Sequence, residues 1–316
     1  MPRKSTSATF TRGDLLGAFE EMPLTIATIG TALLVPMPVM KDKDVFPVVP
    51  REAYLSAPDV KRSPRSGFSR SDFEMDEGSW NCLEYGHEEP WVNSEANLYR
   101  DAFDYERVLA NRGRVIVERR QEMRIAAALH NTTTFPLAGN TGHNCSNAWS
   151  SSSGDPIADV ATGVRGIRAR TGLTPNLLQI SNRAWWDLSR LSTILDRLKY
   201  TMVPGTRVPL QDLANVLGVP RIVVADATYN SANEGQTGTV AEIWSSTYAF
   251  LAVVATGMDF QQPCVGRTFY NQSDFGLMTV EQYHEDEVDI DWYRARQKVD
   301  NQVISSDFGY LIGNCA

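Results

Sequence analysis

The sequence predicts an α+β protein whose sheets are mostly antiparallel. Three observations support this fold class: one unusually long helical pattern at residues 101–130, short helices and apolar strands in turn over 155–255, and alternating polarity over 277–312. The composition agrees, since 42% of the 316 residues are hydrophobic and 22% are charged. Such a chain can bury a substantial core and is not disordered throughout.

The charge and the cysteines exclude some classes of function. A net charge of −8 argues against gripping nucleic acid as the main role, because phosphate neutralisation needs a basic face. It leaves a local basic patch open. We expect no secretory signal, and the apolar stretch 24–40 is too short and too rich in proline to span a membrane. We therefore expect Cys82, Cys145, Cys264 and Cys315 to be free thiols.

The first two blocks of the chain lack the pattern of a core. Residues 1–40 are predicted to form an arm. Residues 41–92 are rich in proline, and their charges are segregated into a basic group followed by an acidic group. A long hairpin explains this pattern if the basic part meets an acidic part, in the same copy or the next. A solvated loop is the alternative. The charged residues are Lys61, Arg62, Arg65, Arg70, Asp72, Glu74, Asp76 and Glu77.

The next block contains the longest predicted helix, over residues 101–130. Leu109, Ile116 and Met123 recur every seven residues and form an apolar stripe, while arginines cover the other faces. Gly113 weakens the middle of the helix by up to about 1 kcal/mol relative to alanine. A helix of this length indicates a spine that crosses the molecule.

Residues 131–225 are predicted to be a linker followed by short, well-capped elements. The polar, glycine-rich residues 131–154 indicate a flexible loop. Asp155 and Pro156 then begin a helix that Gly172 can end with a positive φ. The elements expected after it are a strand over 177–180, a helix capped by Ser181 or Asn182, a helix from Pro209 to Gly218, and a strand over 221–225.

The remaining residues are predicted to be mainly strands. Apolar strands are expected around 243–244 and over 249–255, after a polar loop. Long antiparallel strands are expected over 277–312. Between the linker and these strands, Trp185 and Trp186 sit side by side on a predicted helix. One is expected to enter the core and the other to reach its rim or a contact surface.

We find no constellation that predicts chemistry. The pairs His143/Cys145 and Cys82/His87 lack the second pair that zinc sites use, and the nucleophile-elbow and phosphate-loop motifs are absent from the sequence. If one strand carried all four, Glu285, Glu287, Asp289 and Asp291 would share a face that could hold a hard cation, although a solvated face is favoured. Asp226, at a strand end, is weak evidence. The sequence therefore predicts no catalytic residue, cofactor or metal.

An ordered series of motifs closely resembles the major capsid proteins of tailed bacteriophages with the Hong Kong 97 fold. The match begins at Val45–Pro50 and continues to the end, DFGYLIGNCA. Each motif is weak alone, but the ordered set is specific. The residues that carry it are Trp149, Asp155, Pro156, Ile157, Thr171, Gly172, Pro175, Asn176, Asp196, Arg197, Lys199, Tyr200, Thr201, Tyr229, Asn230, Ala232, Glu234 and Gly235.

The resemblance implies a role for each block. Residues 1–40 would be the N-terminal arm, and 41–92 the E-loop, a hairpin over the adjacent subunit. Residues 93–205 would be the peripheral domain with its spine helix, so the unit 171–201 would be scaffold there. Residues 206–276 would be the axial domain, and 277–316 would return strands to the peripheral domain. The eight charged residues of 61–77 would make contacts between subunits.

The resemblance also implies partners and a location. The chain would assemble with copies of itself into hexamers and pentamers of an icosahedral shell. That shell would enclose double-stranded DNA without reading its sequence, and would carry a portal protein, with scaffolding and decoration proteins as further partners and no membrane. It would be part of the virion, after assembly in the host cytoplasm. Some relatives cross-link a loop lysine to a neighbour; Lys41, Lys43 and Lys61 are candidates by position, although non-covalent packing is expected.

Two other functions remain open from the sequence. The first is an encapsulin-like cellular nanocompartment, which has the same fold but encloses an enzyme; the long loop and the motif series favour the virus. The second is a hydrolase or metalloenzyme that uses His143, Cys145 or the Glu285–Asp291 face. Metal content would distinguish the second from both shell proteins.

Overall fold

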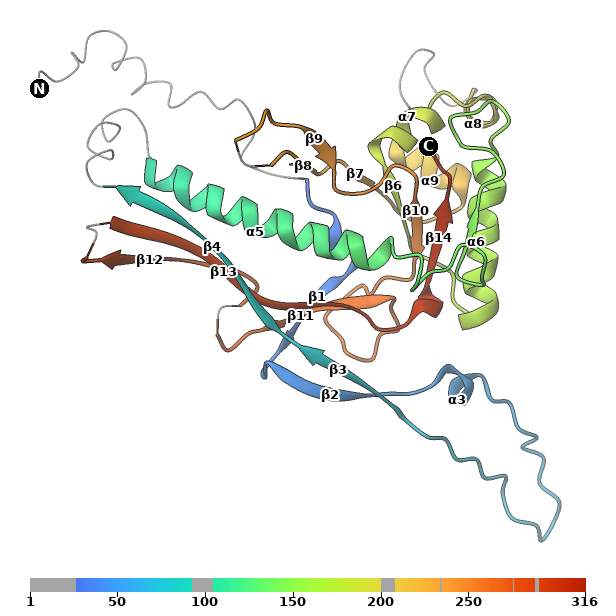
Figure 1. Cartoon of the computed structure of the whole chain (residues 1–316). Coiled ribbons are helices and arrows are strands. Elements are labelled where there is room, and N and C mark those ends of the chain that lie inside the picture. The colour runs from blue at the N-terminus through green and yellow to red at the C-terminus, as the bar shows by residue number, and fades with distance from the viewer. Residues whose placement is uncertain (1–26, 93–104, 200–207, 234, 275, 288–289) are drawn as a thin grey trace, which may run out of the picture.

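The computed structural model describes residues 27–92, 105–199, 208–233, 235–274, 276–287 and 290–316. Two sheets organise these residues, and a long hairpin extends away from both (Figure 1). In the part of the chain that the structure describes, seven strand pairings are antiparallel and three are parallel, as the fold class predicts. Among the described residues, no helix has the length and apolar character needed to cross a membrane.

The first sheet lies beside the spine helix. Its order is β1-β11-β13-β12, with β4 also paired to β13. Alternate side chains of β13 are buried against the helix, namely Tyr293, Ala295, Gln297 and Val299. This confirms the alternation predicted for the C-terminal strands. The strands are β1 (Val35–Val39), β4 (Leu83–Val92), β11 (Gly266–Asn271), β12 (Thr279–Glu285) and β13 (Ile290–Val303).

The spine is α5 (Tyr105–Leu129), roughly 37 Å long at 1.5 Å per residue. Its burial differs from the predicted stripe: Leu109 is buried, but Ile116 and Met123 are only half-buried, while Val115 and Val117 are buried. The reason is that α5 packs against β4 and β13 of the first sheet and also against α2, so more than one face of the helix is covered. Gly113 lies where α5 approaches β13 closely; an added Cβ would be 3.5 Å from Ala295 Cβ.

The second sheet has the order β5-β14-β10-β6-β7. Its strands are β5 (Gly142–Asn144), β6 (Leu177–Ser181), β7 (Ile222–Ala225), β10 (Ala249–Ala252) and β14 (Gly309–Gly313). The helices of this lobe are α6 (Pro156–Thr171), α7 (Asn182–Leu188), α8 (Ser192–Leu198) and α9 (Leu210–Leu217). The smaller elements of the chain are α2 (Gly30–Leu33), α3 (Arg51–Leu55), the hairpin β8 (Thr228–Asn230) with β9 (Val240–Glu242), and the 3₁₀ turn η1 (Ser306–Phe308).

The predicted caps of this lobe are confirmed. The Asp155 side chain accepts a hydrogen bond from Ala158 N at 3.1 Å, and Gly172 ends α6 with φ +75°. Ser181 caps α7 through Ala184 N. Trp185 packs against the core and Trp186 is 47% exposed, as expected for adjacent tryptophans on a helix.

Several expectations are corrected. Residues 131–154 are not a flexible linker, because Phe135 and Trp149 in this segment are fully buried and β5 forms within it. Residues 243–244 are not a strand. The second sheet joins β6 to β7, β10 and β14 and so takes strands from both sides of residue 205, while the expected division into domains stays a prediction. The motif unit 171–201 therefore shares a lobe with residues that were assigned to the axial domain. Residues 1–26 of the predicted arm lie outside the described residues.

A buried carboxylate links the arm, the spine and the second lobe. Glu122 of α5 is 2% exposed and accepts hydrogen bonds from Ile29 N and Gly30 N, each at 2.9 Å. It also accepts a bond from Trp244 Nε1 at 2.6 Å. Burial raises the pKa of Glu122 despite these donors. One side chain thus fastens three distant segments together.

Candidate functional site

The extended hairpin, residues 43–81, is the most prominent surface feature. β2 (Lys43–Val48) and β3 (Asp76–Asn81) form a two-stranded ribbon, and the loop tip (residues 49–75) continues beyond it (Figure 1). Outside α3, the described residues of the tip form no helix or strand. The structure therefore carries this segment away from both sheets, where it can reach another molecule.

An aromatic cluster fixes the root of the ribbon. Phe46 and Trp80 stack with ring centroids 5.9 Å apart, and Trp80 stacks on Phe269 of the first sheet at 5.5 Å. All three side chains are buried. Gly78 is required there, because an added Cβ would lie 2.3 Å from Phe46 Cζ. The hairpin is thus rigid where it leaves the body.

The eight charged residues predicted to make contacts are all exposed. Among the described residues, no ion pair joins the basic group to the acidic group within this chain. Arg62 instead donates to Ser66 O at 2.8 Å and lies over the Phe68 ring at 4.5 Å. The charges of both groups are therefore free to contact another molecule.

The loop tip also exposes apolar side chains that the sequence analysis overlooked. Val60 is 79% exposed, Phe68 72%, Met75 58% and Phe73 49%. Concentrated exposure of large apolar side chains on one segment indicates a protein contact. The sequence could have indicated this contact, because these apolar residues interrupt an otherwise charged and polar stretch.

The lysines considered for cross-linking differ in their surroundings. All three are exposed, and Lys41 Nζ also lies 2.7 Å from Asp44 Oδ2. A covalent link remains a prediction, since nothing in a single subunit tests it.

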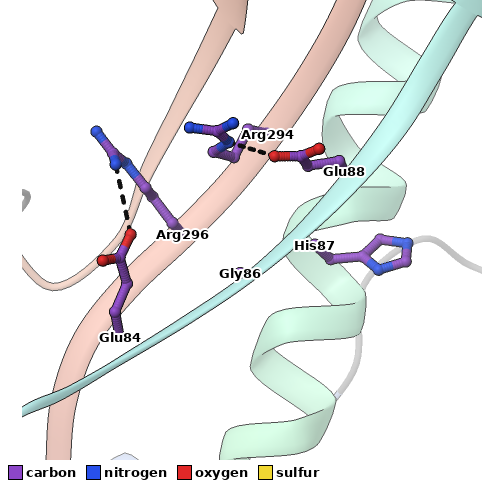
Figure 2. Close-up of a pocket in the computed structure, with 6 residues that line it drawn as sticks. All are labelled: Glu84, Gly86, His87, Glu88, Arg294 and Arg296. Carbon is purple, nitrogen blue, oxygen red and sulfur yellow. Dashed lines mark hydrogen bonds and ion pairs between the residues drawn. The ribbon is translucent and has the colours of Figure 1, made fainter.

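A shallow polar hollow lies on the face of β4 and β13 that points away from α5. Arg294 pairs with Glu88, and Arg296 is 3.4 Å from Glu84 Oε1, while His87 points to the opposite side (Figure 2). Arg296 is also 2.6 Å from Glu281 Oε1 on β12. The arginines and glutamates that line the hollow thus neutralise one another across three strands, an arrangement that stabilises strand pairing.

The acidic strand face predicted over 285–291 does not form. β12 ends at Glu285 and β13 begins at Ile290, so the chain reverses between them. His284 consequently lies opposite Asp291, 2.9 Å from Nδ1 to Oδ1. The side chains were expected to alternate along one strand, but a turn separates them; Asp289 lies outside the described residues.

The fold brings Asp159 to His143 and Cys145, which the sequence could not indicate. Within the described residues, this trio is the only His/Cys/Asp/Glu group of three or more whose ligand atoms gather closely, within 4.8 Å. His143 Nε2 is 3.2 Å from Asp159 Oδ1, and this hydrogen bond raises the pKa of His143 to about 9. Trp149 Nε1 donates to the other oxygen of Asp159 at 2.9 Å.

The chemistry of this trio fits a half-buried ion pair between His143 of β5 and Asp159 of α6. A bond with Cys315, together with burial, raises the pKa of the Cys145 thiol, whereas a cysteine nucleophile or ligand must be a thiolate. His143 Nδ1 has no hydrogen-bond partner among the described residues, but the second nitrogen of a metal-bound histidine normally has one. Cys82 and His87 do not come together in a comparable group in the described part of the chain. All four cysteines are free, as predicted.

No family model matches the sequence. The major capsid protein of Burkholderia phage BcepMu is 22% identical over 289 residues, which cover 90% of each chain. A phage-related protein of Bordetella bronchiseptica RB50 matches with TM-score 0.70 and 20% identity over 97% of this chain and 96% of the other. The capsid structure of cyanophage P-SCSP1u matches with TM-score 0.58 and 15% identity, covering 94% and 92%.

The spine helix, the two sheets and the extended hairpin thus define a Hong Kong 97-type capsid fold, shared with phage capsid proteins along nearly the whole chain. Within that fold, the sequence is similar to the major capsid protein of a Burkholderia phage along most of its length. The encapsulin SrpI of Synechococcus elongatus has a similar fold, with TM-score 0.55 and 15% identity over 96% and 94% of the chains.

Proposed function

We propose that this chain is the shell subunit of a tailed phage and assembles into hexamers and pentamers of an icosahedral shell around double-stranded DNA. The observation that carries the proposal is the extended hairpin, which presents exposed apolar side chains and two uncompensated charge groups. An isolated subunit gains nothing from such a segment. Repeated contacts that close into a shell would bury it once per copy.

The eight charged residues of 61–77 are the proposed contact residues. The basic group of one copy would meet an acidic surface of the next, and the acidic group a basic one. Complementary charge of this kind fixes register and partner choice more than affinity. The apolar residues Val60, Phe68, Phe73 and Met75 would supply the buried area.

We assign the domains by sheet rather than by the boundaries expected from the sequence. The lobe with α5 and the first sheet would be the peripheral domain. The lobe with the second sheet would be the axial domain around the capsomer centre, including residues 155–199. A net charge of −8 would limit adhesion of the shell to packaged DNA. Portal, scaffolding and decoration proteins are the proposed partners, in the virion and, during assembly, in the host cytoplasm.

Mass and shape of the purified protein test this proposal. Light scattering together with negative-stain microscopy should reveal ring-shaped capsomers or closed shells. A chain that stays near 35.2 kDa at high concentration, alone and with any co-expressed scaffolding protein, would contradict it.

A cellular nanocompartment is the second candidate, supported by the likeness to SrpI. The contents of purified particles separate the two. Packaged DNA supports the phage shell, whereas a defined protein cargo in DNA-free particles supports the compartment.

A further inference from the structure

The loop tip touches the body of its own subunit beside α3, just beyond the ribbon. Arg51, the first residue of α3, places Nη1 2.8 Å from Asp307 Oδ2 in η1. The same nitrogen donates to Arg170 O at 3.4 Å, at the C-terminal end of α6. A cation at that end is favoured by the helix dipole. Figure 1 shows α3 between the ribbon and the rest of the loop tip.

Asp307 is itself held firmly by the second lobe. Arg170 Nε is 3.3 Å from Asp307 Oδ1, and the Arg170 side chain is only 11% exposed. Arg170 Nη2 also donates to Asp307 O and Gly309 O, both at 3.0 Å. The carboxylate that receives Arg51 is therefore a fixed point next to β14.

The contacts made by Arg51 are the main attachment between the loop tip and the body of the chain. Among the described residues, the hydrogen bonds and ion pairs between the loop tip and the rest of the chain come from Arg51. Leu55, at the other end of α3, adds an apolar approach, since its Cδ2 lies 4.0 Å from where a Cβ would stand on Gly172. Residues 60–70 lie further out along the loop than α3, so a small rotation of the chain at Arg51 displaces them by a larger distance.

We propose that the clamp formed by Arg51, Asp307 and Arg170 sets the direction in which the loop tip leaves the subunit, and so which surface of a second copy it reaches. Arg51 and Asp307 are positioning residues in this scheme, because they act through the loop and not at the contact itself. The inference rests on the proposed shell function. A single exposed ion pair adds little to folding stability, so the clamp can be broken without unfolding the subunit.

Distances within the isolated subunit test the direction of the loop. The four native cysteines are buried, so spin labels can be directed to engineered cysteines at two exposed serines, Ser69→Cys in the loop tip and Ser192→Cys on α8. Pulsed electron spin resonance should give a narrow distance distribution for the parent chain. Arg51→Glu should broaden or shift it, whereas Arg51→Lys should largely preserve it. Arg165→Glu, an exposed reversal on α6 that gives the same net charge, is the matched control.

Assembly of the same variants, without labels, tests the consequence. We expect Arg51→Glu to yield at least about tenfold fewer closed shells than Arg165→Glu, with an unchanged melting temperature. The clamp would be overturned, and the shell function kept, if the parent chain formed shells and Arg51→Glu changed neither the label distances nor the yield of shells. If the parent forms no shells, the shell function fails, and the distance distributions alone decide whether Arg51 directs the loop.

Discussion

At the scale of single residues, Glu122 is a buried carboxylate that is satisfied by hydrogen-bond donors, with no ion pair to it among the described residues. Glu122 is buried on the spine helix and receives its hydrogen bonds from two backbone amides of the arm and from Trp244. Its partners lie about 90 and 120 residues away in the chain, so local pattern could not predict the contact. Donors to a buried carboxylate are strong and are costly to leave unmatched.

We predict that Glu122→Gln lowers the free energy of unfolding by about 1–3 kcal/mol. Glutamine keeps the shape but replaces one acceptor oxygen with a donor, which would face an amide N–H or the indole. Chemical denaturation measures the change. Glu118→Gln, on the half-exposed side of the same helix, is the control and should cost much less; equal costs would show that the buried bonds contribute nothing.

His130 predicts a pH dependence. Its Nε2 lies 3.0 Å from Gln179 Oε1, and the rings of Trp244 and Tyr248 lie edge-on to it. Burial lowers the pKa of His130 to about 4. The unfolded imidazole takes up a proton near pH 6.5 while the folded one stays neutral, so stability falls as pH drops from about 6.5 to about 4.

We expect this residue to contribute about 3 kcal/mol to that loss, because one pKa unit corresponds to about 1.4 kcal/mol. Denaturation of the parent and of His130→Gln across the pH range should show a shallower slope in the variant. Parallel slopes would mean that His130 titrates normally in the folded chain.

At the scale of elements, prediction succeeded where the determinants are local. Asp155, Pro156 and Gly172 delimit α6 by capping and by a positive φ, and each acts within one turn. Prediction failed for residues 131–154. Their composition is polar, but Phe135 and Trp149 are buried in the hydrophobic clusters of the second lobe. The charges of the loop tip were found from their order in the sequence. The clamp at Arg51 could not be predicted from the sequence, because Asp307 lies 256 residues away in the chain.

The ribbon supplies a prediction at this scale. Gly78→Ala should push Phe46 out of its stack with Trp80, because the added Cβ would overlap the Phe46 ring. We expect a loss of about 1–3 kcal/mol and an altered near-ultraviolet tryptophan signal. Gly67→Ala in the loop tip has open space around the new Cβ and serves as the control. An unchanged spectrum for Gly78→Ala would refute the close packing at the root.

At the scale of the whole molecule, the chain consists of two packed lobes and a hairpin that extends away from both (Figure 1). The charge groups of residues 61–77 are exposed, and among the described residues none of their members forms an ion pair. Their contribution should therefore be visible in assembly and absent from folding.

We predict that reversing Arg62, Arg65 and Arg70 together to glutamate leaves the melting temperature of the subunit unchanged and blocks shell closure, since like charges would meet at the contact. Electron microscopy and light scattering measure closure. Normal shells from this variant would show that loop charge is not needed for register. A triple reversal of Arg165, Arg168 and Arg183, exposed on α6 and α7, controls for net charge.

The position of β14 has a consequence for how the protein is made. This fully buried strand, Gly309–Gly313, lies between β5 and β10, and so it separates segments synthesised long before it. The second lobe cannot close until translation has passed Gly313. A chain abandoned earlier on the ribosome would leave an open edge on β10 and remain a substrate for chaperones and proteases. The place of β14 therefore couples the folding of the second lobe to the synthesis of its last strand.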